Sequence, residues 1–238
     1  MAQTSQSPLS ADDAQRIAVT RIQKLIASRM LASKQNIPCF YLKESADVTD
    51  LADFRRQFGR SHKAKIGTND CIIVAMARAV EKYPLMAGQL IGDCIQIAPT
   101  VNVGLAVAAP QGLVVPVVKD AHKKTLVQLA ADTQHLTDKA RSNALTLADL
   151  DGACITLTNL GVYEIESFYA VSPPGQCSIA AVGKTLDICV PKDGGFVNRK
   201  MMAITVSADY RIVTATYAAA FLNCVIDQLQ NPQSLAIE

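Results

Sequence analysis

The chain has 238 residues, half of them apolar, and its 23 Lys and Arg residues against 21 Asp and Glu residues give a formal net charge of +2. A charge this close to zero, with no Trp and few aromatic side chains, does not favour a nucleic-acid partner, which needs basic surface and rings for stacking. No apolar run approaches the ~18 residues that cross a bilayer, so no membrane partner is expected either.

The seven cysteines are odd in number and form no Cys-x-x-Cys pair. This pattern predicts reduced thiols in an intracellular compartment. The three histidines lie near no cysteine in the sequence, so no metal site is expected. We expect the cysteines to serve as small buried apolar side chains.

Residues 1–15 are rich in Ala, Gln and Ser, contain one Pro, and lack apolar periodicity. They are predicted to be a flexible tail or linker remnant, followed by one domain over residues 16–238. Residues 1–14 contain no Lys or Arg, so they resemble neither a signal peptide nor a transit peptide.

The first half of the chain alternates predicted helices and strands. Helical spacing of apolar residues covers 20–34, a strand follows over 40–48, and further helices are predicted over 49–58 and 68–82. Thr49 or Asp50 is expected to cap the first of these two helices, and Thr68 or Asn69 the second. Two β-rich segments, 101–109 and 113–119, flank a predicted hairpin turn at 110–112.

The second half is richer in strands. A helix capped by Thr125 and a short turn at 146–150 precede predicted strands over 153–158, 178–182, 186–190 and 202–208. Residues 192–195 mark a turn, and a last helix over 214–230 is ended by Asn231 and Pro232. The whole pattern predicts a mixed α/β fold in which helices cover the sheet.

Segments 21–30, 33–41, 102–119, 156–161 and 173–183 together resemble, in this order, the catalytic domain of the dihydrolipoamide acyltransferases. Those proteins are the core subunits of 2-oxoacid dehydrogenase complexes. The resemblance covers about residues 16–238. It implies a chloramphenicol acetyltransferase-like fold that forms a trimer around a three-fold axis, with the family's site between subunits.

Residues 207–215 read Ser-Ala-Asp-Tyr-Arg-Ile-Val-Thr-Ala, where the family has the pattern Asp-His-Arg-x-x-Asp-Gly. Tyr210 stands at the position of the family's catalytic His, and Thr214 at that of the second Asp. Asp209 and Arg211 remain, and we expect them to form a structural pair because alternate residues of a strand share one face.

The resemblance also implies roles for these positions. The family His removes a proton from a thiol, and a hydroxyl corresponding to Thr158, from the neighbouring subunit, stabilises the oxyanion. A phenol with a pKa of ~10 is mainly a hydrogen-bond donor at neutral pH. Loss of a general base typically slows a reaction by ~10²–10⁴, so we expect Tyr210 to fill a packed, silent site.

This pattern resembles the "protein X" subunit of the pyruvate dehydrogenase complex, a non-catalytic core component. Two alternatives stay open: an active or residually active acyltransferase with altered site residues, and a coenzyme A-binding protein. The family's coenzyme A channel corresponds to a segment that includes Asn102, Gly104 and Gly112, and this segment is either a retained channel or a buried hairpin. A basic cluster at Lys119, His122, Lys123 and Lys124 is either a phosphate contact or a solvated loop.

The expected partners follow from the same resemblance. They are two further copies in a homotrimer and the acyltransferase core of the same complex, with dihydrolipoamide dehydrogenase reached only indirectly, through a module absent here. No cofactor is required. Lys139 lies in an Asp-Lys-Ala sequence like that around the modified lysine of lipoyl domains, but the pattern there is helical, so no lipoyl group is expected. The implied compartment is the mitochondrial matrix, or the cytoplasm if the protein is bacterial. The apolar residues 235–237 either dock on a neighbour or fray.

Overall fold

The computed structural model of the chain describes residues 17–110, 112–192 and 194–236. The tail predicted at 1–15 lies outside these ranges, as do residues 237 and 238. Within the described ranges no helix is both long and apolar enough to cross a membrane.

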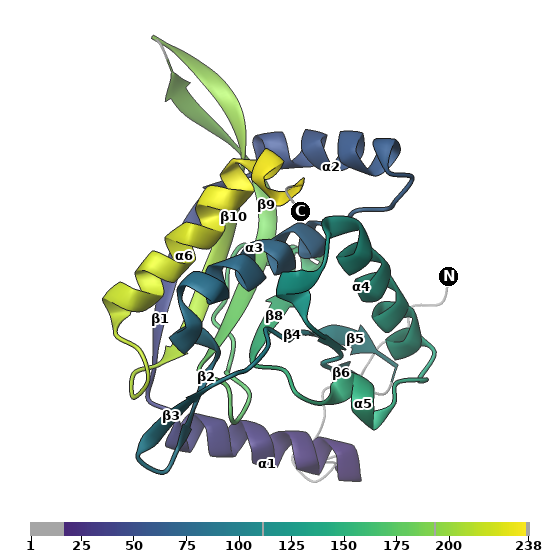
Figure 1. Ribbon diagram of the computed structural model, residues 1–238, viewed down its shortest axis with the longest axis vertical. Helices are drawn as coiled ribbons and strands as arrows, with labels where there is room; N and C mark the ends of the chain where they lie inside the picture. The colour runs from purple at the N-terminus through teal and green to yellow at the C-terminus, as the bar shows by residue number, and fades with distance from the viewer. Residues whose placement is uncertain (1–16, 111, 193, 237–238) are drawn as a thin grey trace, which may run out of the picture.

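A six-stranded mixed sheet forms the centre of the molecule (Figure 1). Its central strand, β8, runs parallel to both neighbours, and the other pairs are antiparallel. In spatial order the strands are β1 (Cys39–Asp47), β10 (Gly195–Asp209), β9 (Ser178–Lys192), β8 (Ile155–Asn159), β4 (Val103–Leu105) and β7 (Val117–Val118).

Two small hairpins lie outside this sheet. One pairs β2 (Gly88–Ile91) with β3 (Cys94–Ile97), which no sequence pattern predicted. The other pairs β5 (Val107–Ala109) with β6 (Gly112–Val114). The hairpin predicted around 110–112 is therefore confirmed, but only its outer arms, β4 and β7, join the main sheet.

Strand β9 is continuous where two strands were predicted, because Gly183 does not interrupt it. A side chain there would meet a crossing segment, since a Cβ on Gly183 would lie 1.8 Å from the carbonyl oxygen of Glu166. Beyond this crossing, β9 and β10 continue as a two-stranded ribbon that projects from the body (Figure 1).

The helices are α1 (Arg21–Asn36), α2 (Thr49–Ser61), α3 (Thr68–Lys82), α4 (Leu126–Arg141), α5 (Leu147–Leu150) and α6 (Ala215–Gln230), with short 3₁₀ turns between and after them. The cap by Thr125 is confirmed, and the predicted short turn at 146–150 is the helix α5, which Thr146 caps. The predicted caps of α2 and α3 are wrong. The Thr49 hydroxyl instead donates to Asp47, and Asp70 at the start of α3 accepts the Gly67 N–H at 2.6 Å.

The core lies between the sheet and the helices α3 and α6, which pack on one of its faces. Buried side chains such as Ile72, Met76 and Phe221 fill it. Leu235, near the last described residue, is also buried within its own chain.

The predicted burial of the cysteines is only partly confirmed, and one helix leaves apolar side chains exposed. Helix α1 leaves the apolar Leu25 and Leu31 more than half exposed, because it packs on the body mainly through its C-terminal end. Cys94 and Cys189 are exposed because they lie on the projecting hairpins, whereas Cys71, Cys154 and Cys177 are buried as expected.

Candidate functional site

Asp209 ends β10 and is almost completely buried, at 2% exposure. Its carboxylate accepts hydrogen bonds from Arg211 Nε at 3.0 Å, from Arg211 Nη2 at 2.6 Å and from the Arg211 backbone N–H at 2.9 Å. Arg211 lies in the turn after the strand, so the pair forms by the chain folding back and not by the strand alternation we had assumed. The pair fixes the turn that presents Tyr210.

Tyr210 is 60% exposed in the single chain, so residues of its own chain leave most of this side chain uncovered. Its backbone N–H donates to Pro38 O at 3.1 Å, and its ring meets Phe40 edge to face at 5.3 Å. Tyr210 is exposed because it follows the last residue pair between β10 and β1, so it lies in the turn beyond the end of the sheet. The phenol therefore lies on a surface that another subunit could cover.

Thr214 is the N-cap of α6. Its hydroxyl accepts the Tyr217 N–H at 3.3 Å and lies 3.0 Å from the Thr216 hydroxyl. The family that the sequence resembles has a carboxylate at this position. In this chain the Thr214 side chain instead accepts a hydrogen bond from a backbone N–H in the first turn of α6, which has no partner within the helix.

Two thiols lie on either side of Asp209. Cys39 is its partner on β1, and the Cys177 carbonyl accepts the Asp209 N–H at 2.9 Å on the β9 side. Burial is the main cause that raises the pKa of Cys39 and that of Cys177, the latter to about 12. Neither thiol is therefore a base at neutral pH.

Thr158 lies on β8, half-buried, and is aligned with Ala181 and through it with Thr205 of β10. Asp209, the neighbour of Tyr210, lies four residues beyond Thr205 on β10. Thr158 is therefore separated from it by roughly 13 Å along the strands and by two strand spacings, about 10 Å, across the sheet. One chain therefore does not bring Thr158 to Tyr210, and a site using both positions needs two chains.

The three residues of the expected coenzyme A segment each have a local role. Asn102 joins loops by donating to Gly152 O at 3.0 Å and accepting the Asp120 N–H at 2.9 Å. Gly104 is buried, and a Cβ there would lie 2.8 Å from the Thr156 hydroxyl on the neighbouring strand. Gly112 is exposed at φ +121°, a conformation that favours glycine.

A cleft of about 210 Å³ adjoins the Asp209–Arg211 pair. Sequence reasoning missed its other walls, which include Ser33, Gln89 and Gln176. Ser33 donates to Ser172 O at 2.5 Å, and Gln176 Oε1 accepts from Thr156 at 2.7 Å. Ser33 and Gln176 lie in segments that resemble the family, but nothing in the sequence placed them beside Gln89, because the fold brings them together from distant segments.

A second cleft, of about 290 Å³, lies between the start of α3 and the end of β8. Asn159, the neighbour of Thr158, donates to Asn69 at 2.7 Å in its wall. Asp70 in the same wall accepts from Thr133 at 2.5 Å, and burial is the main cause that raises the pKa of Asp70.

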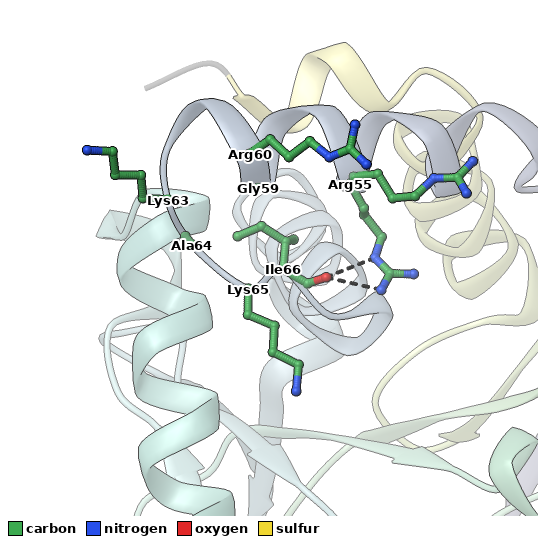
Figure 2. A pocket seen from close by; sticks show the side chains of 8 residues that line it. Arg55, Gly59, Arg60, Lys63, Ala64, Lys65 and Ile66 are labelled. Carbon is green, nitrogen blue, oxygen red and sulfur yellow. Dashed lines mark hydrogen bonds between the residues drawn. The ribbon is translucent and has the colours of Figure 1, made fainter.

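A basic cavity of about 430 Å³ adjoins this second cleft, and Lys65 lines both (Figure 2). Its cations are Arg55, Arg56, Arg60, Lys63 and Lys65. Arg55 is held by the Ile66 carbonyl at 3.0 Å and by Thr68 at 2.6 Å, whereas Lys63 and Lys65 extend outward (Figure 2).

Other charged candidates have local partners. Lys119 donates to the Asp151 carbonyl, Lys123 pairs with Asp120 and Lys124 pairs with Asp132. Lys139 lies on α4 and pairs with Asp149. Among the described residues no three His, Cys, Asp or Glu side chains are arranged to hold a metal ion.

Comparisons with known proteins agree on one family. A sequence profile described as "2-oxoacid dehydrogenases acyltransferase (catalytic domain)" matches residues 11–237. The chain is 34% identical over 220 residues to the dihydrolipoyllysine-residue acetyltransferase component of the pyruvate dehydrogenase complex of Rickettsia prowazekii, covering 91% of this chain and 54% of that protein. It is 35% identical over 225 residues to the mitochondrial dihydrolipoyllysine-residue acetyltransferase component 3 of the pyruvate dehydrogenase complex of Arabidopsis thaliana. This match covers 92% of this chain and 42% of that protein. The chain thus spans about half the length of these relatives.

Solved structures give the same result. The chain superposes on dihydrolipoamide acetyltransferase of Azotobacter vinelandii with a TM-score of 0.89 and 27% identity, covering 98% of this chain and 100% of that one. A chloramphenicol acetyltransferase superposes with a TM-score of 0.50 at 14% identity, covering 85% and 94%, which bears on the fold alone. The predicted mixed α/β, chloramphenicol acetyltransferase-like fold is confirmed.

Proposed function

The chain belongs to the catalytic-domain family of the 2-oxoacid dehydrogenase acyltransferases, and we propose that it is a non-catalytic member of that family. In this role it is a core subunit of a pyruvate dehydrogenase complex that resembles "protein X". The observation that carries the proposal is the turn at 209–211, which keeps the Asp209–Arg211 pair but presents a phenol where the family has an imidazole.

The surroundings of Tyr210 support this role. The neighbouring thiols have raised pKa values, and both oxygens of the Asp209 carboxylate accept hydrogen bonds from Arg211. Thr214 supplies a helix cap and no carboxylate. None of these groups replaces the proton acceptor that the thiol substrate requires at neutral pH.

Acetyl transfer from acetyl-CoA to dihydrolipoamide tests the proposal directly. We expect the unchanged protein to catalyse this transfer about 10²–10⁴-fold more slowly than the Tyr210→His/Thr214→Asp variant, because a general base usually contributes a factor of this size. Phe196→His is the matched control, because Phe196 is also an exposed aromatic residue but lies on the projecting ribbon of β9 and β10. Equal rates for the unchanged protein and the double variant, well above buffer, would establish the alternative, an active acyltransferase with altered residues.

Assembly is the second part of the proposal: the chain forms a homotrimer and docks on the acyltransferase core of the same complex. The face of the sheet opposite α3 and α6 is crossed by the segment 164–175, which is held through bonds such as Thr205 to Phe168 O at 2.5 Å and Ser207 to Ala170 O at 2.7 Å. Large apolar side chains stay exposed there, namely Tyr41, Ile165 and Tyr169, and the rings of Tyr41 and Tyr169 lie 5.2 Å apart. A patch of this kind marks a protein interface.

Coenzyme A binding without chemistry is the second candidate function. The basic cavity and the cleft beside Asn159 share Lys65, and Arg55 bridges them through Thr68. Phosphates in the first and a pantetheine arm in the second would fit this shape and charge. Calorimetry should then detect the binding of coenzyme A, and Lys65→Glu should weaken this binding, whereas Lys82→Glu, at an exposed lysine at the end of α3, is the control. Absence of heat at millimolar coenzyme A excludes this function.

The compartment follows the complex. The matching relatives include bacterial proteins and proteins named as mitochondrial. We propose the mitochondrial matrix for a eukaryotic source and the cytoplasm for a bacterial one, and fractionation alongside the acyltransferase core tests this.

A further inference from the structure

The two halves of the candidate site have changed to different extents. The turn at 209–211 presents a phenol in place of a proton acceptor, whereas Thr158 on β8 carries a hydroxyl. The description of the Azotobacter vinelandii structure names a serine, a histidine and an asparagine in the catalytic mechanism of that protein. Thr158, Tyr210 and Thr214 have the same spacing in this chain. Only the first of these positions keeps its functional group, because threonine replaces serine with another hydroxyl.

The Thr158 hydroxyl is available to a ligand. Residues aligned across neighbouring strands share one sheet face, so Thr158 lies on the face of Thr205, which the segment 164–175 crosses. On this face Thr156 donates to Gln176 at 2.7 Å, whereas the Thr158 hydroxyl makes no hydrogen bond to any residue that the structure describes. A half-buried hydroxyl of this kind can donate to a negatively charged oxygen.

The walls proposed for coenzyme A belong to the same half of the site. Asn159, next to Thr158 on β8, donates to Asn69 at 2.7 Å in the wall of the second cleft. Lys65 lines both this cleft and the basic cavity. None of these residues belongs to the turn at 209–211, so a phenol in that turn leaves this half of the site intact.

The other half lies too far away to act with Thr158 of the same chain. Asp209 and Thr158 are separated by roughly 13 Å along the strands and about 10 Å across them. In a closed ring of three chains each half therefore faces a different neighbour. A ring of three identical chains sets every Thr158 against a phenol, whereas a mixed ring sets one Thr158 against the turn of another subunit.

We propose that this chain replaces one acyltransferase chain in a trimer and completes an active site with its neighbour there. This chain contributes the Thr158 hydroxyl, and the neighbour contributes an imidazole at the position of Tyr210. The shared fold supports such an exchange, since the chain superposes on an acetyltransferase with a TM-score of 0.89. The inference rests on the proposed non-catalytic role and specifies how the chain docks on the acyltransferase core.

Each group has a defined part in acetyl transfer at such a junction. The neighbour's imidazole takes the proton of the dihydrolipoamide thiol, and the thiolate forms a bond to the carbonyl carbon of acetyl-CoA. The carbonyl electron pair moves to the oxygen, to which the Thr158 hydroxyl donates a hydrogen bond. When this pair returns, the bond to the coenzyme A sulfur breaks, and that sulfur takes the proton back from the imidazolium. The products are acetyl-dihydrolipoamide and coenzyme A.

Complementation of two defective chains tests the inference. One is an acyltransferase of this family in which alanine replaces the hydroxyl residue aligned with Thr158, so that it keeps a base and lacks the donor. The other is this chain, which keeps the donor and lacks the base. Mixed trimers are isolated after co-expression through a different tag on each chain. They should transfer acetyl groups about tenfold faster or more than either homotrimer, because one oxyanion donor contributes about 10²–10³ in kcat.

Substitutions in this chain identify the contributed group. Thr158→Ala should abolish the gain, and Thr158→Ser should retain it. The loss should appear in kcat, with KM for acetyl-CoA unchanged, because the hydroxyl acts on charge that develops in the transition state. Thr185→Ala should retain the gain and is the matched control, because Thr185 is an exposed threonine on β9 at the start of the projecting ribbon. Native mass spectrometry confirms that each variant enters the mixed trimers.

The possible outcomes separate this inference from the proposed function. Mixed trimers without a gain, or a gain that survives Thr158→Ala, would overturn the inference and leave the non-catalytic role standing. Separate homotrimers with no mixed particles would also overturn it, while the proposed homotrimer stays. Rapid transfer by the homotrimer of this chain would instead overturn the non-catalytic role itself.

Discussion

The Asp209–Arg211 pair is unequal in burial, and this decides how each partner tolerates change. The Asp209 side chain is 3% exposed and that of Arg211 40%. Loss of the arginine would leave a carboxylate with little access to water, whereas loss of the carboxylate leaves a guanidinium that water can solvate.

We therefore expect Arg211→Ala to lower the free energy of unfolding by about 3 kcal/mol, as for a broken buried pair. Asp209→Asn should cost about 1 kcal/mol, since an amide oxygen still accepts one of the bonds. Urea denaturation of both variants measures the difference. Equal losses, or the reverse order, would contradict the assigned burial.

Asp70 gives a prediction about pH. Folding raises the pKa of this carboxyl mainly through burial, so the folded protein holds the proton more tightly than the unfolded chain. The resulting stability is fully present below the ordinary Asp pKa of ~3.9 and is lost as pH rises through the raised value.

Asp70→Asn removes this titration while keeping an acceptor for the Gly67 N–H and a donor for Thr133. The unfolding free energy of the unchanged protein should therefore fall relative to the variant as pH rises from about 3.5 toward neutrality. Urea unfolding of both proteins across this range measures the difference. Parallel curves would show that burial does not perturb this carboxyl.

At the scale of elements, helix α6 begins at the residue that departs most clearly from the family motif. Thr214 caps the helix through the Tyr217 N–H, and Asp is as good a cap as Thr, with a charge that suits a helix N-terminus.

Thr214→Ala should therefore lower stability by about 1 kcal/mol, whereas Thr214→Asp should retain or slightly raise it. Thermal unfolding separates these outcomes, with Thr216→Ala as a neighbouring hydroxyl that accepts no helix N–H. A destabilised Thr214→Asp variant would mean that this turn rejects the family's own residue.

The segment 164–175 shows how one element constrains another. It crosses the sheet so closely that Gly183 has no space for a side chain, and hydroxyls of β10 hold it by its carbonyl oxygens. The family position Gly183 is thus explained by packing within the chain.

At the scale of the whole molecule, the exposed apolar face over this segment predicts the assembly. Replacing Tyr41 and Tyr169 with Glu should turn the proposed trimer into folded monomers, because both side chains are exposed on this face in the single chain, at 41% and 51%. Light scattering gives the mass. Leu147→Glu, at an exposed apolar residue on α5, is the control. A trimer that survives the double change would place the interface elsewhere.

The sequence alone determined the local structure and the family. The Thr125 cap, the short turn at 146–150, the hairpin around 110–112 and the last helix depend on neighbouring residues, so local patterns predicted them. The contacts at the starts of α2 and α3, in which the carboxylates of Asp47 and Asp70 accept hydrogen bonds, were not predicted. The motif positions 209–211 and 214 were located by sequence, because spacing along the chain is enough to align them.

Only the tertiary structure decided that Tyr210 is exposed, that Thr158 lies far from it and that α1 keeps apolar residues in solvent. Apolar periodicity tells which side chains need covering, but not whether their own chain or another copy covers them. Strand order fixes the distances between motif residues, and that order arises from pairings between segments far apart in the sequence, such as β1 with β10. The clefts beside Asp209 and Asn159 have the same origin, since their walls meet only when the sheet is assembled.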